Sequence, residues 1–201
     1  MPLGDSITQG NSKHNSYRRP LWIQLHKAGY NVDFVGSTRE HVKGASPLSD
    51  FDSDHEGHWG WRVDRVLEKI DDWSRISQPD IVLIHLGNND IIHGQSPEST
   101  IEELWQLIQR LRSIHPRMTL LIAQIIPCGN QARIQQLNRL IVNLARRTNT
   151  QESPVILVDQ FSGFNAAVGV DTYDGCHPNE VGEKKMASRW FDSLKTVLPS
   201  P

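Results

Sequence analysis

Residues 80–90 read DIVLIHLGNND, and this stretch decides the fold class. Its apolar run over residues 81–86 is nearly continuous, which is typical of a strand buried on both faces of a parallel sheet. The run ends in GNND at residues 87–90, a cluster of turn-forming residues. Ligands of open α/β sheets bind at the carboxyl ends of strands, so the sequence predicts a functional edge at this cluster.

Other short apolar runs lie on both sides of this stretch. Residues 31–36, 118–126 and 155–158 are predicted strands, and Leu3 belongs to a short first strand. Between the predicted strands, apolar side chains recur with helical spacing. This alternation predicts an α/β fold with a parallel sheet covered on both faces.

The predicted helices share one pattern, a single apolar face along an otherwise polar segment. The last of them begins at about Asn179 and is expected to bury Val181, Met186, Trp190 and Leu194. Residues 38–57 are polar and without a period, and they predict a long surface loop of the kind that is often functional. The other helical segments are residues 17–28, 63–73, 101–111 and 134–144.

The bulk composition narrows the functional classes. The 201 residues suit a single domain over residues 1–201, with 37% hydrophobic and 22% charged residues. The net charge is -2 and no basic stripe is present, which argues against a nucleic-acid partner. No apolar run is long enough to span a membrane. We therefore expect neither a nucleic acid nor a membrane as a partner; the oligomeric state is not determined by the sequence, and a monomer is the expectation.

Four separated motifs supply the elements of one reaction site. They are GDSIT at residues 4–8, HWGW at 58–61, GNND at 87–90 and DGCHP at 174–178. Each is predicted to follow the end of a strand, so all four are expected at the same edge of the sheet. Their joint occurrence favours a serine esterase, although each motif alone has a simpler explanation as a helix cap or a turn.

The motifs assign a role to each polar residue. Ser6 is the candidate nucleophile, His177 the base that takes its proton, and Asp174 the acid that orients the imidazole. Pro178 disfavours a helical conformation at His177 and should hold it just ahead of the last helix. We expect the Asp174–His177 pair to reach Ser6 from the loop after the last strand.

An esterase also needs donors for the oxyanion of its tetrahedral intermediate. The backbone amides of Ser6 and Gly60 and the side-chain amide of Asn89 are the candidates, because glycine permits close approach and an Asn amide does not titrate. Trp59, Trp61 and His93 are candidate substrate-binding residues beside these motifs. This chemistry needs no cofactor and no metal, and we expect neither.

These motifs resemble those of the SGNH or GDSL hydrolases, through Ser6, Gly60, Asn89 and His177. More narrowly, MPLGDSIT at residues 1–8 and DHEGHWGWR at residues 54–62 look like carbohydrate esterase family three, the acetyl xylan esterases. The resemblance implies a flavodoxin-like three-layer α/β/α sandwich with a five-stranded parallel sheet. It also implies removal of O-acetyl groups from xylan by an enzyme that microbes usually secrete.

Two other functions stay open at this point. One is a general short-chain esterase or thioesterase of the same superfamily. The other, from a different class, is a non-catalytic carbohydrate-binding module in which Trp59 and Trp61 stack on sugars. A third question concerns His55 with Asp50, Asp52 and Asp54, which could bind a cation, although solvated loop charge is the simpler interpretation.

The two cysteines, Cys128 and Cys176, are predicted at the same edge of the sheet because each follows one of two neighbouring strands. In a secreted protein we expect a disulfide between them, and in a cytoplasmic one two buried thiols. The resemblance favours an extracellular location, with a targeting segment absent from this chain.

Overall fold

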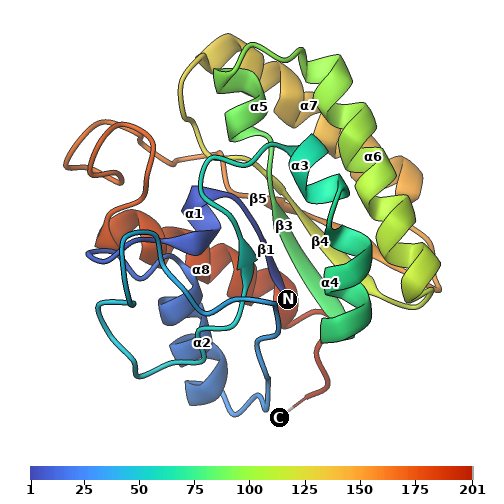
Figure 1. The fold of residues 1–201 in the computed structure, drawn as a ribbon, viewed down its shortest axis with the longest axis horizontal. Helices are drawn as coiled ribbons and strands as arrows, with labels where there is room; N and C mark the ends of the chain where they lie inside the picture. The colour runs from blue at the N-terminus through green and yellow to red at the C-terminus, as the bar shows by residue number, and fades with distance from the viewer. Residues whose placement is uncertain (201) are drawn as a thin grey trace.

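A computed structural model describes residues 1–200 and contains a five-stranded sheet with the order β2-β1-β3-β4-β5, all parallel (Figure 1). This is the flavodoxin-like order, with its switch point beside the first strand. The strands are β1 (Pro2–Gly4), β2 (Glu56–Gly57), β3 (Ile81–His85), β4 (Thr119–Gln124) and β5 (Val155–Asp159). The α/β fold class and the five parallel strands are confirmed.

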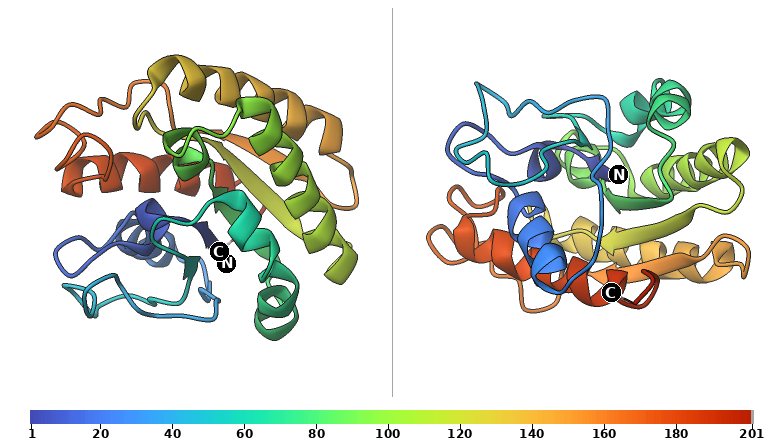
Figure 2. Two further views of the ribbon diagram at one scale, coloured as in Figure 1. Left: turned by 45° about the horizontal axis from the view of Figure 1, so that its top comes forward. Right: turned by 90° about the horizontal axis from the view of Figure 1, so that it is seen from below.

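Helices cover both faces of the sheet (Figure 2). One apolar cluster joins the sheet to α3, α4, α6 and α7, and a second joins its other face to α2 and α8. The helices are α1 (Ser6–Gln9), α2 (Arg18–Lys27), α3 (Val63–Leu67), α4 (Ile70–Ser77), α5 (Asn88–Ile92), α6 (Pro97–Ile114), α7 (Gln131–Thr148) and α8 (Glu180–Leu194). Within residues 1–200, no helix is both long and apolar enough to cross a membrane.

The predicted strand at residues 31–36 is wrong. This segment makes no pairing with the sheet, and Glu56–Gly57 occupies the edge position beside β1 instead. Carboxylates from further along the chain explain the difference: the Phe34 amide donates to the Asp52 carboxylate (2.8 Å), and just after the segment the Ser37 amide donates to the Glu56 carboxylate (2.8 Å). Side chains of the following loop thus take the hydrogen bonds that a neighbouring strand would have made.

The predicted helix at residues 63–73 is broken in two. α3 ends at Leu67 and α4 begins at Ile70, with the Lys69 amide donating to the Val66 carbonyl in a tight turn. Val66 and Ile70 are buried on both sides of the break, so the apolar spacing survives although the helix does not. Periodicity alone could not locate the break.

The last helix begins at Glu180 and is capped by the Asn179 side chain, which accepts from the Val181 and Gly182 amides. Met186, Trp190 and Leu194 are buried as predicted, but Val181 is 53% exposed. The helix lies close against the Asp171 carbonyl at Gly182, where a Cβ would come within 2.1 Å of that oxygen. This contact turns Gly182 inward and its neighbour Val181 outward.

The long loop at residues 38–57 is only partly a surface loop. Phe51, His41 and His55 are buried, and the loop wraps around the fully buried side chain of Arg18. The acidic side chains have protein partners: Asp50 pairs with Arg19, and Asp54 with Arg39. Among the described residues, no group of His, Cys, Asp or Glu side chains is arranged to hold a metal ion.

Candidate active site

Ser6 lies directly after β1, as the first residue of α1. The Asp5 side chain caps this short helix by accepting from the Ile7 amide (2.9 Å). The Asp5-Ser6 pair therefore both caps the helix and presents a hydroxyl at the carboxyl edge of the sheet. Only 7% of the Ser6 surface is exposed, so its hydroxyl faces a confined space.

The loop before α8 supplies the acid-histidine pair. Asp174 accepts from the Nδ1 nitrogen of His177 (2.7 Å) through one carboxylate oxygen. The other oxygen accepts from the amides of Cys176 (3.0 Å) and His177 (2.8 Å). Partial burial raises the pKa of Asp174, but the hydrogen bonds from His177 and Cys176 outweigh it and hold the pKa below its ordinary value.

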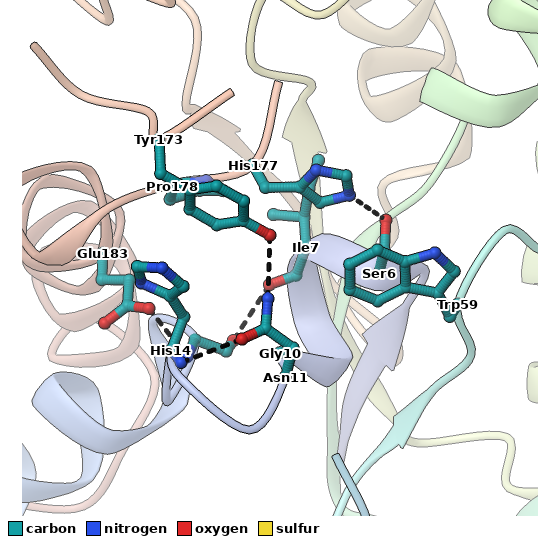
Figure 3. A pocket seen from close by; sticks show the side chains of 11 residues that line it. Ser6, Ile7, Gly10, Asn11, His14, Trp59, Tyr173, His177, Pro178 and Glu183 are labelled. Carbon is teal, nitrogen blue, oxygen red and sulfur yellow. Dashed lines mark hydrogen bonds between the residues drawn. The ribbon is translucent and has the colours of Figure 1, made fainter. Parts of the chain in front are cut away.

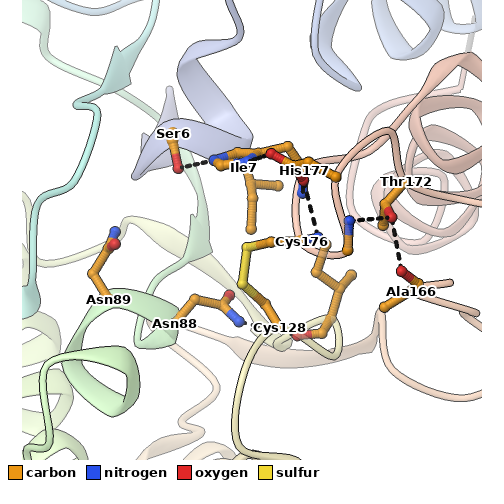
Figure 4. Close-up of a disulfide and its surroundings, with 12 residues drawn as sticks. Ser6, Ile7, Asn88, Asn89, Cys128, Ala166, Thr172, Cys176 and His177 are labelled. Carbon is orange, nitrogen blue, oxygen red and sulfur yellow. Dashed lines mark hydrogen bonds and ion pairs between the residues drawn. A yellow bond between two sulfur atoms is a disulfide. The ribbon is translucent and has the colours of Figure 1, made fainter. Parts of the chain in front are cut away.

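His177 reaches Ser6 through its other ring nitrogen. The Nε2 atom lies 2.9 Å from Ser6 Oγ (Figures 3 and 4). With Nδ1 protonated and bound to Asp174, Nε2 is the free acceptor for the serine proton. The structure thus brings together Ser6, His177 and Asp174 in the relay that activates a serine for nucleophilic attack.

The backbone amides of Ser6 and Gly60 are available as candidate oxyanion donors. Among the described residues, neither the Ser6 amide nor the Gly60 amide donates to a protein acceptor. Gly60 lies in a turn that begins with His58, whose amide donates to the Gly4 carbonyl (3.0 Å). The φ angle of Gly60 is 77°, in the left-handed region that favours glycine. A glycine at this position therefore lets the chain turn with its amide unobstructed.

Asn89, the third candidate donor, is more constrained than the sequence suggested. Its Nδ2 donates to the Trp61 carbonyl (3.0 Å) and to the second carboxylate oxygen of Asp5 (3.3 Å). Both N–H bonds have partners within the protein, so an oxyanion would share this donor with them. Asn89 also ties the Gly60 turn, through Trp61, to the cap of the nucleophile helix.

Asp90 holds the start of α3, which follows the Gly60 turn. It is fully buried, and one of its carboxylate oxygens accepts from the Val63 amide (3.1 Å) at the start of α3. Burial raises the pKa of Asp90 to about 7, and burial with the nearby Asp90 charge raises the pKa of Asp5 to about 7. These two carboxyls therefore share a buried region beside Asn89.

The three predicted substrate-binding residues lie in different places. Trp59 is 38% exposed and lines a cavity beside Ser6 and His177 (Figure 3). Trp61 packs instead against the core and stacks on His58. His93 is an exposed residue at the end of α5. The structure brings neither Trp61 nor His93 into this cavity.

The sequence analysis did not identify most of the residues that line this cavity. Among those it missed are Asn11, His14, Tyr173 and Glu183. Tyr173 directly precedes Asp174, and that adjacency was the one signal available. Asn11 and His14 stand in a polar turn that carries no motif. The lining residues are Ser6, Ile7, Gly10, Asn11, His14, Ser16, Trp59, Tyr173, His177, Pro178 and Glu183.

Cys128 and Cys176 form a disulfide with a Cα–Cα distance of 4.5 Å (Figure 4). Cys128 lies on the loop after β4, and Cys176 directly precedes His177. The bridge therefore ties the histidine loop to a neighbouring strand connection at the same edge of the sheet. His85, beneath this edge, accepts from the Ile126 amide (3.3 Å), and burial lowers its pKa to about 4, so it stays neutral.

The Asp174–His177–Ser6 relay on a flavodoxin-like sheet places this chain in the class of α/β serine hydrolases. The GDSL-like lipase/acylhydrolase family matches residues 1–190, and the chain belongs to this family. It is a carboxylic ester hydrolase of the family, related to the family 3 carbohydrate esterases.

Two solved structures and one curated protein show the relationship. A family 3 carbohydrate esterase from Talaromyces cellulolyticus is 32% identical, with 98% of this chain and 96% of that chain covered and a TM-score of 0.87. An acetyl esterase mutant with an acetate ion is 33% identical at the same coverage and TM-score. A multidomain esterase from Ruminococcus flavefaciens is 31% identical over 98% of this chain. This chain spans 28% of that relative, and 59% and 58% of two further curated relatives.

The first prediction concerns the disulfide. It links positions 48 residues apart, and closing a loop of this length stabilises a fold by about 4 kcal/mol in the chain-entropy model. We expect no free thiols on titration of the unfolded, unreduced protein. The double variant Cys128→Ser, Cys176→Ser should lose stability in urea titrations. Two titratable thiols in the unreduced protein would contradict the bridge.

The second prediction concerns Asn89. Asn89→Ala should lower kcat by about a hundred-fold, the usual effect of one lost oxyanion donor, with little change in KM. Asn89→Asp, which keeps the shape but has no N–H bond, should lose as much. Steady-state kinetics on a small ester decide the matter, and an effect on KM alone would place Asn89 in ground-state binding.

The third prediction concerns pH and Asp90. Because its pKa is raised in the folded state, its contribution to stability is present at low pH and is lost as the pH rises through about 7. Asp90→Asn keeps the acceptor for Val63 and removes the charge. Relative to wild type, it should therefore be more stabilised at about pH 8 than at about pH 5.5 in urea titrations. The exposed Asp192→Asn serves as the control, and equal differences at both pH values for Asp90→Asn would refute the buried charge.

Proposed function

We propose that this chain removes O-acetyl groups from xylan or a related acetylated polysaccharide through an acyl-enzyme intermediate. The observation that carries the proposal is the continuous relay from Asp174 through His177 to Ser6, while the amides of Ser6 and Gly60 donate to no protein acceptor among the described residues. The names of the related acetyl esterase and family 3 carbohydrate esterase support the acetyl group and the carbohydrate.

Each residue then has a defined role in the reaction. Ser6 Oγ attacks the ester carbonyl while its proton passes to His177 Nε2. Asp174 stabilises the imidazolium, and the Ser6 and Gly60 amides, with Asn89, bind the oxyanion. As the bond between the carbonyl carbon and the sugar oxygen breaks, His177 gives its proton to that oxygen; the sugar leaves as an alcohol and acetyl-Ser6 remains. A water molecule, activated by His177, then releases acetate and restores the serine.

The proposal extends to where the protein acts. A disulfide that persists in the working enzyme suits an oxidising compartment, so we place the protein outside the cytoplasm. An acetylated polysaccharide is also a substrate that an extracellular esterase would meet. Acetylated polysaccharide, or a small acyl ester, is the partner that we propose for the site.

The fourth prediction tests the substrate. We expect acetate release from acetylated xylan, and among p-nitrophenyl esters we expect kcat/KM to fall as the acyl chain lengthens from acetyl to octanoyl. Ser6→Ala is the matched control and should lose on the order of a million-fold in kcat while keeping its circular dichroism spectrum. A preference for octanoyl esters without acetate release from xylan would favour a general esterase. If the Ser6→Ala variant kept a tenth of the wild-type rate, Ser6 would be excluded as the nucleophile.

A further inference from the structure

Two aromatic rings are stacked on His177. The indole of Trp59 is stacked on the imidazole at a centroid distance of 4.6 Å and an interplanar angle of 14°. The phenol of Tyr173 is stacked at 5.6 Å and 13°. Figure 3 shows the His177 ring close to both, with its Nε2 directed at Ser6. The three rings are nearly parallel, at distances typical of favourable aromatic pairs.

Tyr173 is itself held from several directions. His14 is stacked on it at 4.1 Å and 10°. The Tyr173 hydroxyl accepts from the Asn11 side-chain amide (2.9 Å), and its backbone amide donates to the His177 carbonyl (3.0 Å). These contacts hold the Tyr173 ring in one orientation. The ring therefore restrains the orientation of the His177 imidazole that is stacked on it.

Trp59 is anchored by its backbone rather than by its ring. Its amide donates to the Gln9 side chain (2.8 Å), and the preceding residue, His58, donates to the Gly4 carbonyl (3.0 Å). Gln9 ends the nucleophile helix α1, and Gly4 ends β1. The position of the indole is therefore fixed relative to the segment that carries Ser6, although Trp59 belongs to a different loop.

The stack complements the hydrogen bonds of His177. The hydrogen bonds to Asp174 and Ser6 are made by the two ring nitrogens, in the plane of the imidazole, and they restrain rotation within that plane. They leave the ring free to tilt out of that plane, and the Asp174 side chain is 42% exposed. The two rings stacked on the imidazole oppose this tilt. Their electron-rich faces also favour the imidazolium that forms when His177 takes the serine proton.

We propose that Trp59 and Tyr173 are positioning residues that hold the His177 imidazole in the plane required for proton transfer. This inference rests on the proposed function, because it assumes that His177 is the base. It changes the role predicted for Trp59, whose indole is stacked on the catalytic imidazole and is only 38% exposed. Trp59 thereby acts on catalysis even where the substrate carries no sugar.

The fifth prediction uses ethyl acetate, a substrate with neither a sugar nor a ring. Trp59→Leu and Tyr173→Leu should each lower kcat by about ten-fold to a hundred-fold, the scale expected for a misplaced catalytic group, with KM changed by less than about three-fold. Trp59→Phe and Tyr173→Phe retain a ring and should stay within about five-fold of the wild-type kcat. Trp105→Leu is the matched control, because Trp105 is 40% exposed on α6 and does not line the cavity.

Several outcomes would overturn the inference. Wild-type kcat on ethyl acetate in Trp59→Leu, with a raised KM only on acetylated xylo-oligosaccharides, would make Trp59 a sugar platform. Loss of activity in Trp59→Phe equal to that in Trp59→Leu would also exclude a role for the ring stack. If Tyr173→Leu does not fold, as judged by circular dichroism, the Trp59 series decides alone.

A spectroscopic measurement separates this inference from the proposed function. In proton NMR, the Trp59 ring current shifts the carbon-bound protons of the His177 imidazole upfield, so Trp59→Leu should move them downfield. This result supports the stack whether or not the protein hydrolyses esters, and unchanged resonances would overturn it. Absence of Ser6-dependent hydrolysis in the wild-type protein would instead remove the proposed function.

Discussion

The site depends on the register of β1 between its two neighbours. Gly4 of β1 pairs with Gly57 of β2 on one side and with His85 of β3 on the other. Ser6, Gly60 and Asn89 each follow one of these paired residues by a few positions. Three motifs that lie far apart in sequence therefore emerge at one height on the carboxyl edge. A shift of one residue would move the nucleophile away from its oxyanion donors and reverse the faces of the strand.

His177 is not positioned by the strand register. It lies on the loop between β5 and α8, so other contacts must fix its position. This loop pairs with no strand of the sheet, and it is held by its own backbone bridges together with side-chain contacts. Asp171 accepts from the Asn165 amide (2.7 Å) and pairs with Lys185 (2.7 Å). Asn179 caps α8 and donates to the Thr172 carbonyl (3.2 Å). With the disulfide at Cys176, these contacts fix both ends of the segment, and the aromatic stack then orients the ring at its centre.

The sequence was a good guide to whatever depends on local chemistry. The apolar runs of β3 and β4 and the four motifs were predictable because burial and turn formation have local signatures. The edge strand β2 was not, because the pairing choice between residues 31–36 and residues 56–57 depends on carboxylates elsewhere in the loop. Trp59 and Trp61 stand on either side of Gly60 in the same motif, yet Trp59 lines the cavity and Trp61 packs against the core. Only the direction of the turn at Gly60 separates them.

The nucleophile stands on a helix that could not persist alone. α1 has four residues, fewer than an isolated helix needs, so its ends must be satisfied from outside. Asp5 caps the first turn, and the buried guanidinium of Arg18 donates to the carbonyls of Thr8 (2.8 Å) and Gln9 (2.9 Å) at the other end. Burial lowers the pKa of Arg18 to about 10, so the group remains charged at neutral pH. The Arg18 cation at the carboxyl end complements the helix dipole. The burial of Arg18 under the loop of residues 38–57 is therefore part of how Ser6 is held, although Arg18 lies outside the residues that line the cavity.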